Sequence, residues 1–274
     1  MFSILRERLR QKHRTIEYPS GPPPELSERF AGRPVVSGPC DGPCDRCAAA
    51  CPTGALVVGP GGPRIDTGRC LFCRDCERAC PEGRVTFTGE YRLAASSRED
   101  LVVASGSPAF APVLVERARA LFGRSLKLRQ VSAGGCNACE AECNVLGTPA
   151  WDFGRFGIQF VASPRHADGL LITGPVTANM AEALRKTYQA VPAPKIVIAV
   201  GACAISGGPY IGHAEAHDGA ASVVPVDIYV PGCPPEPLTI LAALLSTNAA
   251  NPIASGGTRP TPAPAAASRR PRPD

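Results

Sequence analysis

Two quartets of cysteines stand near the start of the chain, at spacings that suit metal binding. The downstream quartet, in CLFCRDCERACP, follows the pattern C-x₂-C-x₂-C-x₃-C-P with Cys70, Cys73, Cys76 and Cys80. Thiolates at this spacing hold iron–sulfur clusters, because one tight loop can wrap three of them around a cluster while the fourth reaches a second cluster. One such run therefore predicts another run nearby.

The second run lies upstream, in CDGPCDRCAAACP, and contributes Cys40, Cys44, Cys47 and Cys51. Its first gap is one residue longer, with Asp41 where the regular ligand would fall, and we take Cys40 as the ligand on a lengthened loop. A zinc site also favours C-x₂-C pairs, but two quartets that each end in Cys-Pro fit two [4Fe–4S] clusters better.

The crossed arrangement of such runs assigns each cluster three thiols from one quartet and the last thiol of the other. The first set is then Cys40, Cys44, Cys47 and Cys80. The second set is Cys70, Cys73, Cys76 and Cys51.

Further cysteines follow apolar, β-rich segments in the second half of the chain. LKLRQVSAGGC, KIVIAVGAC and VDIYVPGC share one pattern, in which an apolar run leads through glycine to cysteine. A third [4Fe–4S] cluster requires four thiolates. This third set is Cys136, Cys139, Cys203 and Cys233. Cys143 is left over, and we expect it to be a small buried hydrophobe on the helix face of Cys139.

The elements that position these thiols follow from the same segments. The apolar runs alternate with the helical stretches TANMAEALRKTYQ and PPEPLTILAALLS, which predicts an α/β domain with a parallel sheet. Ligands gather at the carboxyl ends of such strands, so the three cysteine loops should project from one edge. Upstream, the internal repeat predicts an α+β domain in which GALVV and GRVTFTGEY are extended segments that pair beside the clusters.

Composition excludes several classes of protein. The 274 residues are 44% apolar and can support a packed core. The 13 cysteines would suggest disulfides in a secreted protein, but the N-terminus lacks the apolar stretch of a signal peptide, which favours the cytoplasm and metal ligation. The sequence contains no run of 18 apolar residues, the length needed to span a membrane. A net charge of +5 with 5% aromatic residues does not indicate a nucleic-acid-binding protein.

Changes in composition divide the chain into five parts. The expected parts are an N-terminal docking segment (1–33), the two-cluster domain (34–95), a linker helix (96–124), the α/β domain (125–248) and a disordered tail (249–274). In the first part, Phe2, Leu5 and Leu9 stand near helical spacing among basic residues and predict a short amphipathic docking helix, with a membrane-surface role as the less favoured alternative. The tail is rich in Pro, Ala and Arg and cannot bury enough apolar surface to order itself.

GGCNACE, SPRHADGLLITGPVT, GACAISGG and VPGCPP resemble the small subunit of energy-converting (group 4) [NiFe] hydrogenases, which is related to the 20 kDa subunit of respiratory complex I. This resemblance covers about residues 125–245 and implies a flavodoxin-like domain. RLRQKHRTIEYP followed by the two cysteine runs is similar to the ferredoxin-like subunit of the same complexes. The chain therefore resembles two neighbouring subunits fused into one, with a ferredoxin-like two-cluster domain first.

The resemblance implies an electron-transfer subunit that relays electrons through three [4Fe–4S] clusters. Its implied partners are a large subunit that bears the [NiFe] site, or a homologous complex I 49 kDa-like subunit, together with membrane subunits and a redox donor or acceptor. The chain would thus lie on the cytoplasmic face of the membrane, held there through its partners. Glu140 resembles the acidic residue that the family places near the active site, which implies a proton relay, whereas a solvated or helix-capping glutamate is the alternative.

Two other functions stay open. A complex I-like quinone or sulfur reductase would use WDFGRFGIQF to line part of its acceptor pocket, and a non-catalytic iron–sulfur assembly or storage protein would need no such pocket. Complex I proteins carry adjacent cysteines at the first ligand position, whereas Cys136 and Cys139 are separated as in hydrogenases. The resemblance therefore favours a hydrogenase.

Overall fold

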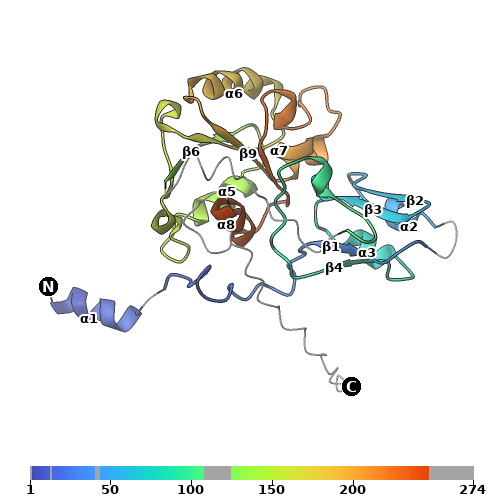
Figure 1. Ribbon diagram of the computed structural model, residues 1–274, viewed down its shortest axis with the longest axis horizontal. Helices are drawn as coiled ribbons and strands as arrows, with labels where there is room; N and C mark the ends of the chain where they lie inside the picture. Colours follow the sequence, from blue (N-terminus) through green and yellow to red (C-terminus); the bar gives the residue numbers. More distant parts are fainter. Residues whose placement is uncertain (1, 13, 41–43, 108–124, 247–274) are drawn as a thin grey trace.

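The computed structural model of the protein describes residues 2–12, 14–40, 44–107 and 125–246 (Figure 1). The disordered tail expected over 249–274 and most of the expected linker helix lie outside these ranges, as does Asp41. Across the described residues, no helix combines the length and the apolar character needed to cross a membrane.

Residues 125–246, called the second half below, contain a sheet of five parallel strands. The spatial order of these strands is β10-β9-β8-β6-β7. They are β6 (Leu126–Ser132), β7 (Ile158–Phe160), β8 (Gly169–Thr173), β9 (Ile196–Val200) and β10 (Ile228–Val230). Numbered along the chain, the order is 2-1-3-4-5, so the winding reverses between β6 and β8. The predicted parallel sheet is confirmed.

Helices cover both faces of this sheet (Figure 1). One face carries α5 (Ala138–Val145) and α8 (Pro237–Ser246), and the other carries α6 (Ala178–Ala190) and α7 (Ala202–Ser206). Because both faces are covered, every residue of β8 and of β9 is buried, as expected for strands with continuous apolar runs. The helices predicted from TANMAEALRKTYQ and PPEPLTILAALLS correspond to α6 and α8.

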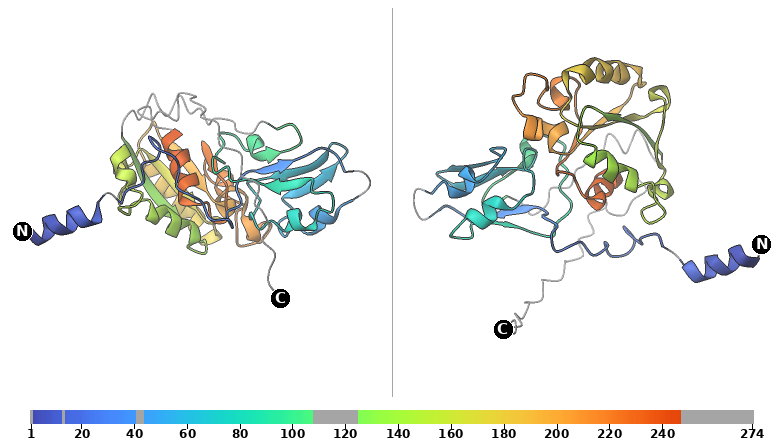
Figure 2. Two further views of the ribbon diagram at one scale, coloured as in Figure 1. Left: turned by 90° about the horizontal axis from the view of Figure 1, so that it is seen from below. Right: turned by 180° about the vertical axis from the view of Figure 1, so that it is seen from behind.

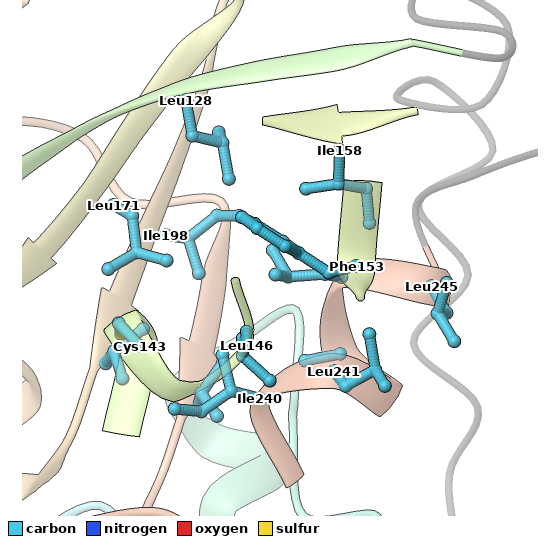
Figure 3. Packing of buried hydrophobic residues seen from close by; sticks show 14 of the residues in the cluster. Leu128, Cys143, Leu146, Phe153, Ile158, Leu171, Ile198, Ile240, Leu241 and Leu245 are labelled. Atoms are coloured by element: carbon cyan, nitrogen blue, oxygen red, sulfur yellow. The ribbon is translucent and has the colours of Figure 1, made fainter. Parts of the chain in front are cut away.

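The face under α5 and α8 holds a core of large aliphatic side chains (Figure 3). Leu128 and Leu171 reach it from the sheet, and Ile240 and Leu241 reach it from α8. Cys143 is fully buried in this core, so its predicted burial is confirmed.

Residues 34–107, called the first half below, form a mixed α+β region whose described residues contain two small antiparallel sheets. One sheet pairs β1 (Pro34–Val36) with β4 (Val85–Phe87), and the other joins β2 (Leu56–Gly59), β3 (Gly62–Asp66) and β5 (Val102–Val103) in that order. Its two helices are α2 (Arg46–Ala49) and α3 (Asp75–Ala79). GALVV and GRVTFTGEY thus contain strands β2 and β4, which belong to different sheets.

Short 3-10 helices occur at Glu99–Leu101 (η1), Phe153–Phe156 (η2), Pro164–His166 (η3), Gly208–Tyr210 (η4) and Ala220–Ser222 (η5). Together η1 and β5 continue the first half beyond residue 95, because β5 adds the third strand to the sheet of β2 and β3.

The expected docking segment has two parts with different surroundings. After α1 (Phe2–Gln11), the chain runs in an extended course along the second half, where the Ile16 amide donates to the Ala150 carbonyl at 2.9 Å. Tyr18 is buried in the core under α5 and α8, and Arg155 donates to its carbonyl at 2.6 Å. Residues 15–18 therefore dock on the second half of their own chain, and Gly32 and Arg33 pair with Thr88 and Glu90 of the first half. Helix α1 projects away from both halves (Figure 2).

Candidate functional site

The third set of thiols meets at the carboxyl edge of the parallel sheet. Cys136 follows β6, and Cys139 lies in the first turn of α5. Cys203 lies in the first turn of α7, directly after β9, and Cys233 follows β10. The loop after β6 also contacts the loop after β8, so this edge lies where the strand order reverses, the usual place for a ligand in such sheets.

Three thiols of the third set, those of Cys139, Cys203 and Cys233, have raised pKa values. Burial raises the pKa of Cys139, and the nearby Cys203 thiol raises it further. Burial also raises the pKa of Cys203 to about 11, with Cys233 and Cys136 as the next contributors. The pKa of Cys233 is raised by burial and then by Cys136. Each of these shifts is caused in part by another thiol of the third set, so the four side chains lie near one another.

Glycines leave the space that this group occupies. A Cβ on Gly201, where φ is +92°, would lie 2.5 Å from the Cys139 Sγ atom. A Cβ on Gly208, where φ is +55°, would lie 2.9 Å from the Cys203 Sγ atom. Both positions therefore require glycine, for the backbone conformation and for the close approach to sulfur. Thiols held by a glycine-lined edge fit the donor set of a [4Fe–4S] cluster.

One side of the third set faces outward. Cys136 and Cys233 are exposed, whereas Cys139 and Cys203 are partly buried. A cluster held by these four thiols would therefore be reachable from the surface of this chain.

Glu140 is buried beside the third set, with 6% of its surface exposed. Its Oε1 atom accepts hydrogen bonds from Ser132 Oγ at 2.6 Å and from Thr173 Oγ1 at 2.7 Å. The alternative of a solvated glutamate is therefore wrong. The carboxylate instead ties the first turn of α5 to the ends of β6 and β8.

The thiols of the first set lie near one another in the first half of the chain. The pKa of Cys40 is raised by burial and also by the nearby thiols of Cys44 and Cys80. The pKa of Cys47, on α2, is raised by burial and next by Cys80. These four thiols are the combination that the crossed arrangement predicts.

The second set gathers around α3. Burial raises the pKa of Cys70 to about 12, with Cys76, Cys51 and Cys73 also raising it. The pKa of Cys76 is raised to about 11 by burial and next by Cys51. Cys47 of the first set also raises the pKa of Cys76, so α2 and α3 bring the two sets next to each other.

Backbone amides point at sulfur in both sets of the first half. The amides of Ala55, Phe72 and Arg84 each donate to a cysteine Sγ at 3.2 Å. Hydrogen bonds of this kind tune the potential of iron–sulfur clusters. Within the described ranges, no three Cys, His, Asp or Glu side chains converge as the ligands of a single metal ion would. In a cubane each thiolate binds a different iron atom, so its ligands need not converge on one point.

A cavity of about 400 Å³ adjoins Cys233. It is lined by residues 25–27 and 29–31 of the docking segment, by Phe72 of the first half, and by Glu142 and Glu236. Burial raises the pKa of both carboxyl groups, and Glu142 raises that of Glu236 further. No pattern in the sequence indicates this pair, because the two glutamates are far apart in the chain and belong to no spaced motif.

Comparisons with known proteins agree on the second half. The family described as "NADH ubiquinone oxidoreductase, 20 Kd subunit" matches residues 136–247. The probable membrane-bound hydrogenase subunit mbhJ of Pyrococcus furiosus is 45% identical over 44% of this chain and 72% of that protein. Formate hydrogenlyase subunit 7 of Escherichia coli is 47% identical over 43% of this chain and 46% of that protein. A subunit of the NADH-quinone oxidoreductase of Clostridium beijerinckii is 42% identical over 41% of this chain and 67% of that protein.

Proposed function

Since the chain belongs to the family of the 20 Kd subunit of NADH ubiquinone oxidoreductase, we propose that it carries electrons in a [NiFe] hydrogenase-type complex. It is an oxidoreductase subunit of the hydrogenase and NADH-quinone oxidoreductase type. The [NiFe] site belongs to a partner large subunit. This chain therefore carries the electrons, and the partner subunit catalyses the reaction of hydrogen.

The observation that carries the proposal is the meeting of four thiols at one sheet edge. Cys136, Cys139, Cys203 and Cys233 come from three loops at this edge, and other thiols of the set help to raise the pKa values of Cys139, Cys203 and Cys233. The strand order 2-1-3-4-5 is that of a flavodoxin-like fold, in which ligands bind at the reversal of winding. The exposed side of this third set supports an interface with the large subunit.

The first half supports the proposal as a ferredoxin-like domain with two further clusters. When bound, [4Fe–4S] clusters supply one-electron carriers whose potentials depend on hydrogen bonding and burial. The second set of thiols lies next to the third, because Gly68, two residues before Cys70, contacts Ile205 and Ser206 on α7. The first set is then the outer one, where electrons enter or leave.

Two features favour hydrogen over quinone chemistry. Cys136 and Cys139 are separated, as the resemblance to hydrogenases requires, whereas complex I proteins carry adjacent cysteines there. WDFGRFGIQF, which would line part of an acceptor pocket in the quinone or sulfur reductase alternative, forms η2 and β7 and buries Phe153 in the core. Relatives of both kinds match this chain, so the partner's chemistry decides between them.

Glu140 is proposed as a proton relay beside the third set. Its carboxylate is within reach of two hydroxyl groups, those of Ser132 and Thr173, which can pass a proton along hydrogen bonds. The same bonds also give Glu140 a structural role, so its relay function needs a test that separates the two.

The proposed function is tested on the complex purified anaerobically with its partner subunits. Hydrogen uptake with an artificial electron acceptor, together with a partner that carries two C-x-x-C pairs, would support the hydrogenase. A complex that shows no hydrogen turnover and reduces quinone or polysulfide would overturn the hydrogenase but leave the electron-transfer role. A chain that binds clusters and no redox partner would favour the assembly or storage alternative.

A further inference from the structure

Helix α1 exposes its apolar side chains to solvent. Phe2 is 88% exposed and Leu9 is 78% exposed, and Ile4 and Leu5 are also exposed large hydrophobic residues. All three views place α1 away from both halves of the protein (Figures 1 and 2). Large apolar side chains gathered on one short helix mark a surface that is covered in the working protein.

The apolar residues of α1 form a strip. At about 100° per residue, Phe2, Leu5 and Leu9 share one face of the helix, whereas Ile4 lies about 130° from the middle of that face. Arg6 and Arg8 stand about 80° to either side of the strip. The strip is therefore bordered by a guanidinium group on each flank.

The helix and the residues just after it are strongly basic. The basic residues are Arg6, Arg8, Arg10, Lys12 and Arg14. The only acidic residue among residues 2–14 is Glu7, which lies 3.7 Å from Arg10 in an ion pair. An occupant of this surface must accept both an apolar strip and a dense positive charge.

We infer that α1 docks this chain directly on an anionic phospholipid surface, lying in the plane of the membrane interface. A helix of this kind buries its apolar strip at the boundary of headgroups and acyl chains, while flanking arginines extend their stems to reach the phosphates. Positive charge on both flanks suits a lipid surface, which is anionic on either side of the helix, better than a protein groove. The chain thus has its own membrane contact, in addition to any held through partner subunits.

This inference does not depend on the clusters or on hydrogen chemistry. The second half already holds Ile16 and Tyr18, a few residues after α1, so docking of α1 would set the distance and tilt of the protein relative to the membrane. Docking on lipid also accounts for the position of α1 away from the described parts of both halves.

The test uses the full-length chain and sedimentation with two kinds of vesicle. One kind is pure phosphatidylcholine, and the other contains about three parts phosphatidylcholine to one part phosphatidylglycerol. We expect binding to the anionic vesicles to exceed binding to the neutral ones by more than about tenfold, and to weaken as salt is added.

Variants separate docking through the strip from general adsorption. Leu5→Asp and Leu9→Asp should each abolish binding, whereas Ile4→Asp makes the same change of charge outside the strip and should retain most of it. Equal binding of all three variants would assign the adsorption to other basic segments and overturn the inference. Wild-type protein that ignores the vesicles, while Leu9→Asp releases the chain from its partner subunits, would overturn it in favour of a protein groove.

Discussion

Ser206 on α7 donates a buried hydrogen bond of 2.9 Å to the carbonyl of Gly68, across the boundary between the two halves of the chain. Gly68 lies two residues before Cys70, and Ser206 lies three residues after Cys203. A Cβ on Gly68 would lie 2.8 Å from the Ile205 side chain, so this side chain of α7 packs closely against the Gly68 backbone. This bond therefore holds the second and third sets of thiols next to each other.

Replacing Ser206 with Ala should loosen this junction. The Gly68 carbonyl would lose its buried donor, which costs about 1–2 kcal/mol in the free energy of unfolding. We expect an unchanged iron content and slower reduction of the third cluster by an external donor, measured by stopped-flow spectroscopy. Ser105→Ala, at an exposed position, is the control and should change neither quantity. Equal transfer rates in both variants would show that the junction does not govern transfer.

Gly201→Ala should remove the third cluster and leave the other two. The new Cβ would stand 2.5 Å from the Cys139 Sγ atom, and residue 201 has a φ of +92°. Gly212→Ala is a matched control, because its φ of +74° carries similar strain but its Cβ would meet nothing within 4 Å. We expect iron to fall from about 12 to about 8 atoms per chain only in Gly201→Ala. The same loss in both variants would make strain, not contact with sulfur, the cause.

Two cysteine replacements distinguish a cluster ligand from a residue of the hydrophobic core. Cys136→Ala should lower iron from about 12 to about 8 atoms per chain after anaerobic reconstitution, because one ligand of the third set is gone. Cys143→Ala should keep about 12 iron atoms and lower the free energy of unfolding by about 1 kcal/mol, because it empties part of a packed core. Iron content that does not respond to Cys136→Ala would contradict the third cluster.

Glu140→Gln should slow hydrogen turnover without loss of clusters. The glutamine oxygen can still accept from Ser132 and Thr173, so the fold is kept while the titratable proton is removed. Glu142→Gln, on the same helix and beside the cavity at Cys233, is the comparison. Hydrogen production and iron content are measured for both variants. If only Glu142→Gln slows turnover, the relay runs through the cavity, and Glu140 has a structural role alone.

The cluster-free chain should lose stability in alkali. Burial raises the pKa of Cys70 to about 12 and the pKa values of Cys76 and Cys203 to about 11, above the value of about 8.5 in an unfolded chain. The folded thiols thus hold protons that the unfolded ones have released, and the free energy of unfolding falls as pH rises from about 9 towards 11.

Cluster binding should remove this alkaline loss, because thiolates bound to iron carry no proton to lose. Urea unfolding of the cluster-free and reconstituted chains at about pH 8 and pH 10 measures the difference. A reconstituted chain that loses as much stability as the cluster-free one would contradict ligation by these thiols.

Local patterns in the sequence were enough to predict much of this protein. The parallel sheet and helices α6 and α8 follow from apolar periodicity, which acts over a few residues. The burial of Cys143 is expected from its place on the helix face of Cys139, outside the ligand sets. The grouping of Cys40 with Cys80, and of Cys70 with Cys51, followed from spacing, because the geometry of a tight loop depends on the number of residues between its thiols.

Tertiary structure alone decided the contacts between distant segments. No periodicity indicates that Tyr18 enters the core of the second half, that Ser206 bonds to Gly68, or that Glu142 and Glu236 share a cavity. The burial of Glu140 also depends on hydroxyl groups at the ends of two separate strands. Such contacts depend on how whole elements pack, and each joins residues whose separation along the chain carries no local signal.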